Sequence, residues 1–397
     1  MRKIFCILLF LSSFSCFYAQ RSDSMATNNL EASLLTCSPG TEIYQYYGHT
    51  ALLIKDLDNG QNYVFNYGLF DFNTPNFLWR FLLGECDYLC GVTTLESFLR
   101  NYEQRGTGVR EDVLNLTSEE TAYLFDALKT NSLPENATYR YDFFYDNCAT
   151  RVRDQIEHCI NGKIHYASST KLQSLRDIVH ESSMPYKWSY FGQDLLLGAQ
   201  ADRMASRIQQ EFSPIYLQHD ICTAYVENSE GRVRPLVTSS QTLVEDKDVT
   251  FSKGFPLSPK VCCLILLLVT IILSAIDIRK ARPCCWLYDL FLMLLQGLAG
   301  LLITFMFFFS KHPTVDTNWL ILLFNPIPLV VLYWVIRKER HNRKSIYHAV
   351  VRIYLFLFIC STYFIPQYIS IEVNILALCL LLRSMSNHII YTYRLRT

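Results

Sequence analysis

The chain's central cysteine, Cys148, stands where a thiol can serve as a nucleophile. It follows Asp146-Asn147 and precedes Ala149–Ile160, in which apolar residues recur at helical spacing. A thiolate at the first turn of a helix is stabilised by the helix dipole and by unpaired N–H groups, both of which lower its pKa. The same N–H groups can bind a developing oxyanion. Taken alone, this position is more often filled by a small buried residue that starts a helix.

His49 is the candidate base for Cys148. It begins the apolar segment His49–Lys55, which alternates as a strand, and it follows Gly48, where another backbone or a substrate can approach closely. An imidazole can accept the thiol proton and return it to a leaving group. A lone histidine here would more often be a hydrogen-bonded core residue. Together with Cys148, His49 predicts a cysteine enzyme that transfers an acyl group.

A third polar group is needed to orient the His49 ring. Asn66 is the preferred candidate, because it is the polar residue of the next predicted strand that shares the His49 face, and Asp71 is the substitute. A packing or turn amide is an equally common role for an asparagine at position 66.

The hairpin turn at Asp58-Asn59-Gly60 leaves two strand registers open. A turn centred on Asn59-Gly60 places Asn66 opposite Leu53, too far along the strand to reach His49. A turn centred on Asp58-Asn59 places Asn66 opposite Ala51, diagonal to His49 and within side-chain reach.

The segments around these residues predict an α+β domain. Each is recognised from its periodicity and from the turn or capping residues at its ends. The predicted strands are Leu30–Thr36, His49–Lys55, Gln61–Tyr67, Val109–Leu114 and Thr138–Phe144. The predicted helices are Leu95–Gln104, a helix opened by the capping box at Thr117 and ending near Leu128, Ala149–Ile160 and Leu195–Gln210. Thr238–Lys253 is predicted as a polar linker.

Charge and cysteine content argue against nucleic-acid binding and against a metal site. Lys+Arg and Asp+Glu number 36 each, so the chain lacks the basic excess of a nucleic-acid-binding protein, and we expect no nucleic-acid partner. Cys86 and Cys90 have no nearby histidine, which favours structural thiols or a disulfide over a metal site. We expect neither a metal nor a cofactor.

The N-terminus resembles a secretory signal. Arg2-Lys3 precedes the apolar run Ile4–Phe14 and then Ala19-Gln20, so residues 1–19 are predicted as a signal peptide cleaved after Ala19. An uncleaved anchor and a degenerate lipoprotein box at Cys16 are the alternatives. Residues 20–258 then form the exported catalytic domain, and residues 259–397 form a membrane domain.

The composition changes near Pro259, and about five membrane helices are predicted after it. They are Val261–Ile276, Leu287–Phe309, Trp319–Ile336, Val350–Ile365 and Tyr368–Leu382. Basic residues follow the first, third and last of these runs, whereas the other loops are nearly uncharged. By the positive-inside rule the exported domain is periplasmic and the C-terminus is cytoplasmic, which agrees with the signal peptide.

Polar residues also lie within the predicted membrane helices. Asn325-Pro326-Ile327-Pro328 should break its helix, and Glu372 and Asn374 should face a partner or cavity. Helix packing is the expected role for these residues, and a part in lipid entry is the alternative.

The order of these groups resembles the circularly permuted papain-like fold of lecithin:retinol acyltransferase-like enzymes and NlpC-type hydrolases. More closely, three runs are similar to the N-terminal periplasmic domain of the Lnb family, the lipoprotein N-acyltransferases of Bacteroidetes. They are SLLTCSPGTEIYQYYGHTALLI (33–54), YVFNYGLFDF (63–72) and YRYDFFYDNCATRVRD (139–154). Two further features also resemble the Lnb family, namely the run FGQDLLLGAQADR (191–203) and the polytopic C-terminus. His49 and Cys148 match the family pattern, whereas the third group matches only as the NYG segment.

The resemblance implies a two-step acyl transfer at an inner membrane. Cys148 would take an acyl chain from a phospholipid as a thioester, and the N-terminal amine of a diacylated lipoprotein would then accept it, with His49 as base in both steps. The aromatic residues Phe70, Phe72, Phe77, Trp79 and Phe81 could line an acyl-binding wall, although ordinary packing explains most of them.

Three other functions are compatible with the sequence. The first is an NlpC-type cell-wall amidase or peptidase anchored in the membrane, which would need only one anchor. The second is a phospholipase or thioesterase with water as acceptor. The third is a non-catalytic membrane module that retains the fold.

Overall fold

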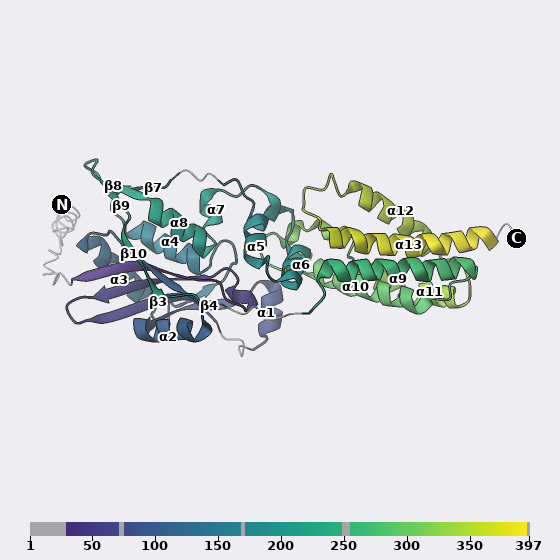
Figure 1. The fold of residues 1–397 in the computed structure, drawn as a ribbon, viewed down its shortest axis with the longest axis horizontal. Coiled ribbons are helices and arrows are strands. Elements are labelled where there is room, and N and C mark those ends of the chain that lie inside the picture. Colours follow the sequence, from purple (N-terminus) through teal and green to yellow (C-terminus); the bar gives the residue numbers. More distant parts are fainter. Residues whose placement is uncertain (1–28, 71–74, 168–170, 248–254, 395–397) are drawn as a thin grey trace, which may run out of the picture.

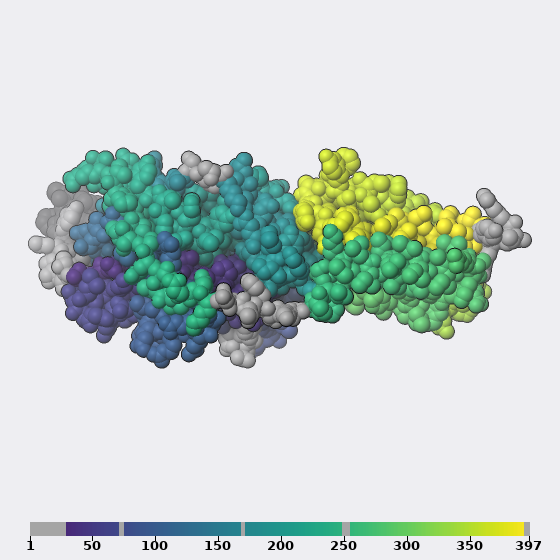
Figure 2. All heavy atoms as spheres, in the orientation of Figure 1, coloured from purple at the N-terminus to yellow at the C-terminus, as the bar shows by residue number. Residues whose placement is uncertain are grey.

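The computed structural model describes residues 29–70, 75–167, 171–247 and 255–394. A sheet-containing domain, purple to teal in Figure 1, is followed by a narrower bundle of long helices, green to yellow. The space-filling view in Figure 2 shows the two parts end to end, with the bundle as the slimmer one. The predicted α+β domain followed by an all-α membrane domain is therefore confirmed. The predicted signal peptide lies outside the described residues.

The first domain is built on a seven-stranded sheet in the order β10-β5-β1-β2-β3-β4-β6, and its neighbouring strands are antiparallel. A small second sheet has the order β7-β8-β9. The strands are β1 (Leu30–Cys37), β2 (His49–Asp56), β3 (Gln61–Leu69), β4 (Asp87–Thr94), β5 (Val109–Leu114), β6 (Thr138–Arg140), β7 (Lys163–His165), β8 (Tyr225–Glu227), β9 (Val233–Pro235) and β10 (Val237–Val244).

Helices cover both faces of the larger sheet. One core joins strand residues such as Leu52 and Phe65 to α3, α4 and α8, and a second core joins Ala51 and Leu53 to α2. Alternate residues of β2 thus enter opposite cores, as the period of a strand requires. The helices of this domain are α1 (Phe77–Leu83), α2 (Leu95–Arg105), α3 (Ser118–Asn131), α4 (Cys148–Cys159), α5 (Leu175–Ser183), α6 (Lys187–Leu196), α7 (Arg207–Gln210) and α8 (Pro214–Thr223), with short 3₁₀ turns η1 (Ile43–Gln45) and η2 (Ala199–Asp202).

The β2–β3 hairpin adopts one of the two registers that the sequence leaves open. Leu52 pairs with Phe65 and Asp56 pairs with Gln61. Continued by one residue, this register sets Asn66 opposite Ala51, so Asn66 lies diagonal to His49. The turn is therefore centred on Asp58-Asn59, where Asp56 accepts hydrogen bonds from the Asp58 and Asn59 backbone.

Three predicted segments differ in the structure. The predicted strand over Thr138–Phe144 ends at Arg140, because Asp142 Oδ1 accepts the N–H groups of Phe144 and Tyr145 and turns the chain. The segment Thr238–Lys253 is not simply a linker, because β10 pairs with β5 at the sheet edge. Its mostly exposed polar side chains are typical of an edge strand. Residues 248–253 of that segment lie outside the described residues.

The predicted helix Leu195–Gln210 is interrupted because its central part docks on the membrane domain. Gly198 approaches the loop near Thr314 so closely that a Cβ would lie 2.1 Å from the Thr314 carbonyl oxygen. Asn318 Nδ2 donates to Leu195 O at 2.8 Å, and Gln367 Nε2 donates to Leu197 O at 3.1 Å. These bonds engage carbonyls that end α6, and they join the two domains.

A buried arginine holds the same segment from the other side. Arg176, which is 1% exposed, forms ion pairs with Asp194 at 2.9 Å and Asp202 at 2.8 Å, and donates to Leu197 O. The run FGQDLLLGAQADR thus supplies a structural connection between the domains, and its acidic residues bind Arg176.

Between residues 255 and 394, the described part of the second domain contains five α-helices, and four segments there are long and apolar enough to cross a membrane. The helices are α9 (Pro259–Arg279), α10 (Trp286–Phe309), α11 (Ile327–Arg340), α12 (Ile346–Ser361) and α13 (Ile371–Arg394), with 3₁₀ turns η3 (Val315–Thr317) and η4 (Trp319–Leu322). α12 has 16 residues and is shorter than a full span. The proline-containing segment breaks its helix as predicted, because α11 begins only at Ile327.

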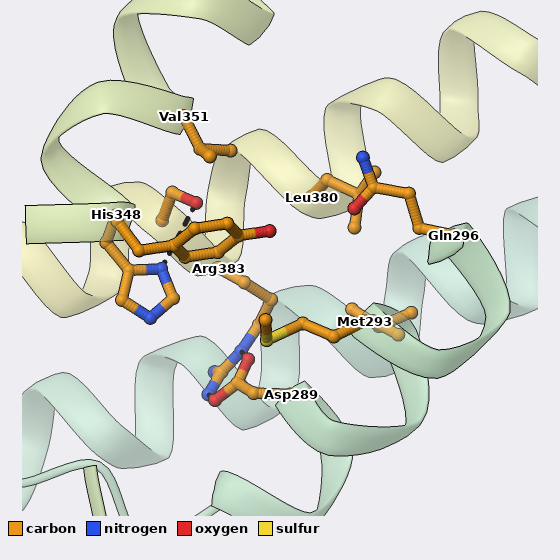
Figure 3. Close-up of a pocket in the computed structure, with 10 residues that line it drawn as sticks. Asp289, Met293, Gln296, His348, Val351, Leu380 and Arg383 are labelled. Carbon is orange, nitrogen blue, oxygen red and sulfur yellow. Dashed lines mark hydrogen bonds and ion pairs between the residues drawn. The ribbon is translucent and has the colours of Figure 1, made fainter. Parts of the chain in front are cut away.

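The prediction that the last span ends at Leu382, with Arg383 in a basic loop, is wrong. Arg383 lies inside α13, and its guanidinium pairs with Asp277 at 2.7 Å and Asp289 at 2.6 Å. Figure 3 shows Arg383 beside Asp289, with His348 on a neighbouring helix. A buried charge persists in an apolar bundle when it is paired and hydrogen-bonded, so the helix continues past this arginine. The polar residues Asn374 and Glu372 lie in the first turn of α13, where Asn374 Nδ2 donates to Ser370 O at 3.2 Å.

Candidate active site

His49 begins β2 and is held by the neighbouring strand. Its Nε2–H donates to Asn66 Oδ1 at 2.6 Å, which leaves Nδ1 as the ring nitrogen available to a nucleophile. The diagonal placement of the two residues on β2 and β3 explains this contact. Asn66 thus orients the imidazole through its amide oxygen. Asp71, the other candidate for this position, lies outside the described residues.

Cys148 is the first residue of α4, and the residue before it caps the helix. Asn147 Oδ1 accepts the N–H groups of Ala149 at 2.9 Å and Thr150 at 3.0 Å. Asn147 Nδ2 donates to two backbone carbonyls, so this buried cap is held rigidly. Cys148 itself is partly buried.

His49, Cys148 and Gly68 surround one small space at the end of the sheet. Gly68 has φ +91°, and a Cβ built on it would lie 3.7 Å from both Cys148 Cβ and His49 Cε1. The pairing of β3 with β4 shifts by one residue between Asn66 and Leu69, which indicates a bulge at this position. A glycine here leaves room beside the sulfur for a reacting carbonyl group.

The charges of the two side chains stabilise one another. Burial raises the pKa of the Cys148 thiol, but the positive charge of the neighbouring His49 and its hydrogen bond to the sulfur outweigh burial, so the pKa lies below the usual 9.0. Burial lowers the pKa of His49, but the Cys148 charge and hydrogen bonds with Cys148 and Asn66 raise it above 6.5. Each side chain therefore stabilises the charged form of the other.

The pKa values of the other described cysteines of this domain are raised, whereas that of Cys148 is lowered. Burial raises the pKa of Cys37, Cys159 and Cys222 to about 12 and that of Cys90 to about 11, and it raises the pKa of Cys86 as well. All of them are unpaired in the structure. Within the described ranges, no group of three His, Cys, Asp or Glu side chains is arranged to hold a metal ion.

Oxyanion binding at the start of α4 differs from the sequence-based expectation. The N–H groups of Ala149 and Thr150 already donate to Asn147, so they are not available to a substrate. The backbone N–H of Cys148 has no acceptor among the described residues. It is therefore the donor that remains next to the sulfur.

Tyr139 is a site residue that sequence analysis missed. Its hydroxyl is buried, has no hydrogen-bond partner in the described part of the chain, and lies 4.0 Å from the Cβ position of Gly68. Burial and the Cys148 charge raise its pKa, so the hydroxyl keeps its proton and can donate. The Arg151 guanidinium carbon lies 3.8 Å from the centroid of the Tyr139 ring, and Arg151 is itself paired with Asp146. The spacing Tyr139-x₈-Cys148 carries no recognisable motif, and only the fold brings the two residues together.

Comparisons with known proteins agree with this architecture. Residues 17–181 match the model of the Lnb N-terminal periplasmic domain, and residues 250–394 match that of the Lnb transmembrane domain. The chain belongs to the Lnb family. A periplasmic Lnb domain followed by an Lnb transmembrane domain indicates an inner-membrane protein. Comparison with curated proteins and with solved structures gave no match.

If the charge pair is correct, Cys148 should be the cysteine of the Lnb periplasmic domain that iodoacetamide alkylates first at pH 7. Peptide mapping by mass spectrometry measures the rate for each cysteine. The Cys148 rate should rise with pH to a plateau, with its inflection below pH 9.0. In His49→Gln the inflection should move upward, because burial then acts without the opposing imidazolium. A wild-type inflection at or above 9.0 would contradict the charge pair.

Proposed function

We propose that this protein is a lipoprotein N-acyltransferase that uses Cys148 as nucleophile, His49 as base and Asn66 as the group orienting the base. One observation carries the proposal: the His49 ring is hydrogen-bonded to the Asn66 amide oxygen and lies with Cys148 beside Gly68. The histidine precedes the cysteine along the chain, which is the order of the permuted papain-like enzymes. The phospholipid donor, the diacylated lipoprotein acceptor and the cytoplasmic C-terminus are parts of the same proposal.

In the first half-reaction the Cys148 thiolate attacks the carbonyl carbon of a phospholipid ester. The tetrahedral oxyanion is stabilised by the Cys148 N–H and the Tyr139 hydroxyl. As the ester C–O bond breaks, the His49 imidazolium gives its proton to the departing alkoxide. The products are a lysophospholipid and an acyl thioester on Cys148.

In the second half-reaction the free N-terminal amine of a diacylglyceryl-cysteine lipoprotein attacks the thioester carbonyl. The neutral His49 accepts a proton from the amine, the C–S bond breaks, and the thiolate–imidazolium pair is restored. The amide product carries the third acyl chain. Both substrates reside in the membrane, which suits a catalytic domain docked on membrane helices.

Cells that lack this protein should accumulate lipoproteins without the N-terminal acyl chain. Mass spectrometry of a lipoprotein N-terminus should detect that chain again after complementation with the wild type, and should not detect it with Cys148→Ala. Cys222→Ala is the matched control, because Cys222 is also half-buried but has a raised pKa. Restoration of the acyl chain by Cys148→Ala would contradict the mechanism. Release of free fatty acid in place of lipoprotein acylation would indicate a hydrolase.

Tyr139→Phe should slow thioester formation by roughly 10²-fold, the usual cost of losing one oxyanion donor. Folding should be preserved, because the substitution removes a buried hydroxyl without a partner and leaves the ring on Arg151. Single-turnover kinetics and thermal unfolding measure the two effects.

Tyr67→Phe is the matched control for Tyr139→Phe. The Tyr67 hydroxyl is buried in the same core and has no oxygen or nitrogen partner among the residues that the structure describes, but it faces Cys90. Its removal should leave the acylation rate unchanged. Equal rates for Tyr139→Phe and the wild type would exclude the Tyr139 hydroxyl from the oxyanion site.

A further inference from the structure

The short helix α1 exposes an unusual amount of apolar surface. Leu78, Trp79 and Phe81 are 77%, 54% and 47% exposed, although six of the seven residues of α1 are apolar. Neighbouring large apolar residues in one exposed patch commonly mark a contact surface. The one charged residue of α1, Arg80, turns back to donate to Glu85 O and to pair with Asp87. The outward surface of α1 is therefore left without a charged group of its own.

α1 is fixed to the end of a membrane helix. The backbone N–H of Lys311, just after α10, donates to Leu83 O at 2.8 Å. His312 Nε2 bonds to Phe81 O at 2.6 Å, and Lys311 Nζ pairs with Glu85 at 2.7 Å. In Figure 1, α1 lies where the sheet domain meets the bundle. These bonds tie the helix to the loop that follows α10.

The contact between Trp79 and Phe305 gives the depth of α1. Their ring centroids are 5.0 Å apart, and Phe305 lies one turn before the last residue of α10, Phe309. Since α10 is long and apolar enough to cross a membrane and rises by about 1.5 Å per residue, Phe305 lies about 6 Å inside the end of that helix, with the Trp79 ring packed beside it. Tryptophan is enriched at this depth in membrane proteins. The exposed side chains of α1 then contact lipid rather than water.

A continuous row of aromatic rings connects α1 with the site. Phe81 stacks on Phe77 at 6.3 Å, Phe77 on Phe70 at 6.2 Å, and Phe70 on Tyr88 at 4.9 Å. Tyr88 stacks on Tyr141 at 4.1 Å. Cys148 packs against the same hydrophobic cluster as Tyr88 and Tyr141.

We propose that α1 lies in the periplasmic leaflet of the bilayer and that the phospholipid acyl chain reaches Cys148 along the rings from Phe81 to Tyr141. The occupant of this surface is thus a bilayer phospholipid. This choice of occupant rests on the contact between Trp79 and Phe305, which makes the exposed surface of α1 continuous with the membrane span α10. The placement of α1 stands on these contacts alone, whereas the acyl route rests on the proposed function.

Photo-crosslinking tests the placement of α1 without using activity. Leu78 is replaced by p-benzoylphenylalanine in the full-length protein in phosphatidylethanolamine/phosphatidylglycerol vesicles. The matched control carries the same replacement at Tyr123, which is 59% exposed on α3, a helix that packs on β1 and α4. Mass spectrometry should find phospholipid adducts at position 78 and at least tenfold fewer at position 123. Equal labelling at the two positions would overturn the inference.

A comparison of two acyl donors tests whether the route begins at the lipid-facing surface of α1, to which Leu78 belongs. Leu78→Asn should slow Cys148 thioester formation from vesicle phospholipid by roughly tenfold, the effect of losing the burial of one leucine. It should leave the reaction with a water-soluble short-chain ester unchanged, and Tyr123→Asn should alter neither. Equal loss with both donors, or no loss with vesicles, would overturn the route. A wild type inactive with both donors would refute the proposed function, and crosslinking alone would then decide the placement of α1.

Discussion

The mutual stabilisation of charge by Cys148 and His49 is the interaction on which the rest of this site depends. Burial alone would keep both groups neutral, because it disfavours either charge. Their proximity and the hydrogen bond of His49 to the Asn66 amide oppose that tendency. The site therefore requires the start of β2 and the start of α4 to lie side by side. The β2–β3 register positions the start of β2, and the Asn147 cap positions the start of α4.

The two domains are connected in a way that gives this charge pair a defined position relative to the membrane. On one side, carbonyls at the end of α6 accept hydrogen bonds from Asn318 and Gln367. On another side, α1 is bonded to the segment after α10. Two separate attachments restrict the rotation of the periplasmic domain against the bundle more than a single linker would.

Much of the fold follows from periodicity, whereas the tertiary contacts that end its elements do not. The hairpin residues at positions 58–60 restricted Asn66 to two registers, and packing selected the one that reaches His49. The prediction at Leu195–Gln210 was wrong because the close approach of Gly198 to Thr314 is invisible in a local pattern. Arg383 looked like a loop residue because its partners, Asp277 and Asp289, lie about a hundred positions away in the chain. Tyr139 was missed because an unpartnered hydroxyl has no sequence signal. The catalytic roles of Cys148, His49 and Asn66 stay predictions.

The central claim is that the sulfur of Cys148 carries the acyl chain between donor and acceptor. Intact-protein mass spectrometry after mixing the purified protein with phospholipid, in the absence of a lipoprotein acceptor, tests it most directly. We expect a mass increase of one acyl group, located on the Cys148 peptide and removed by neutral hydroxylamine, which cleaves thioesters. An acyl group on another residue, or no acylated Cys148 in a preparation that acylates a lipoprotein once one is added, would contradict the mechanism.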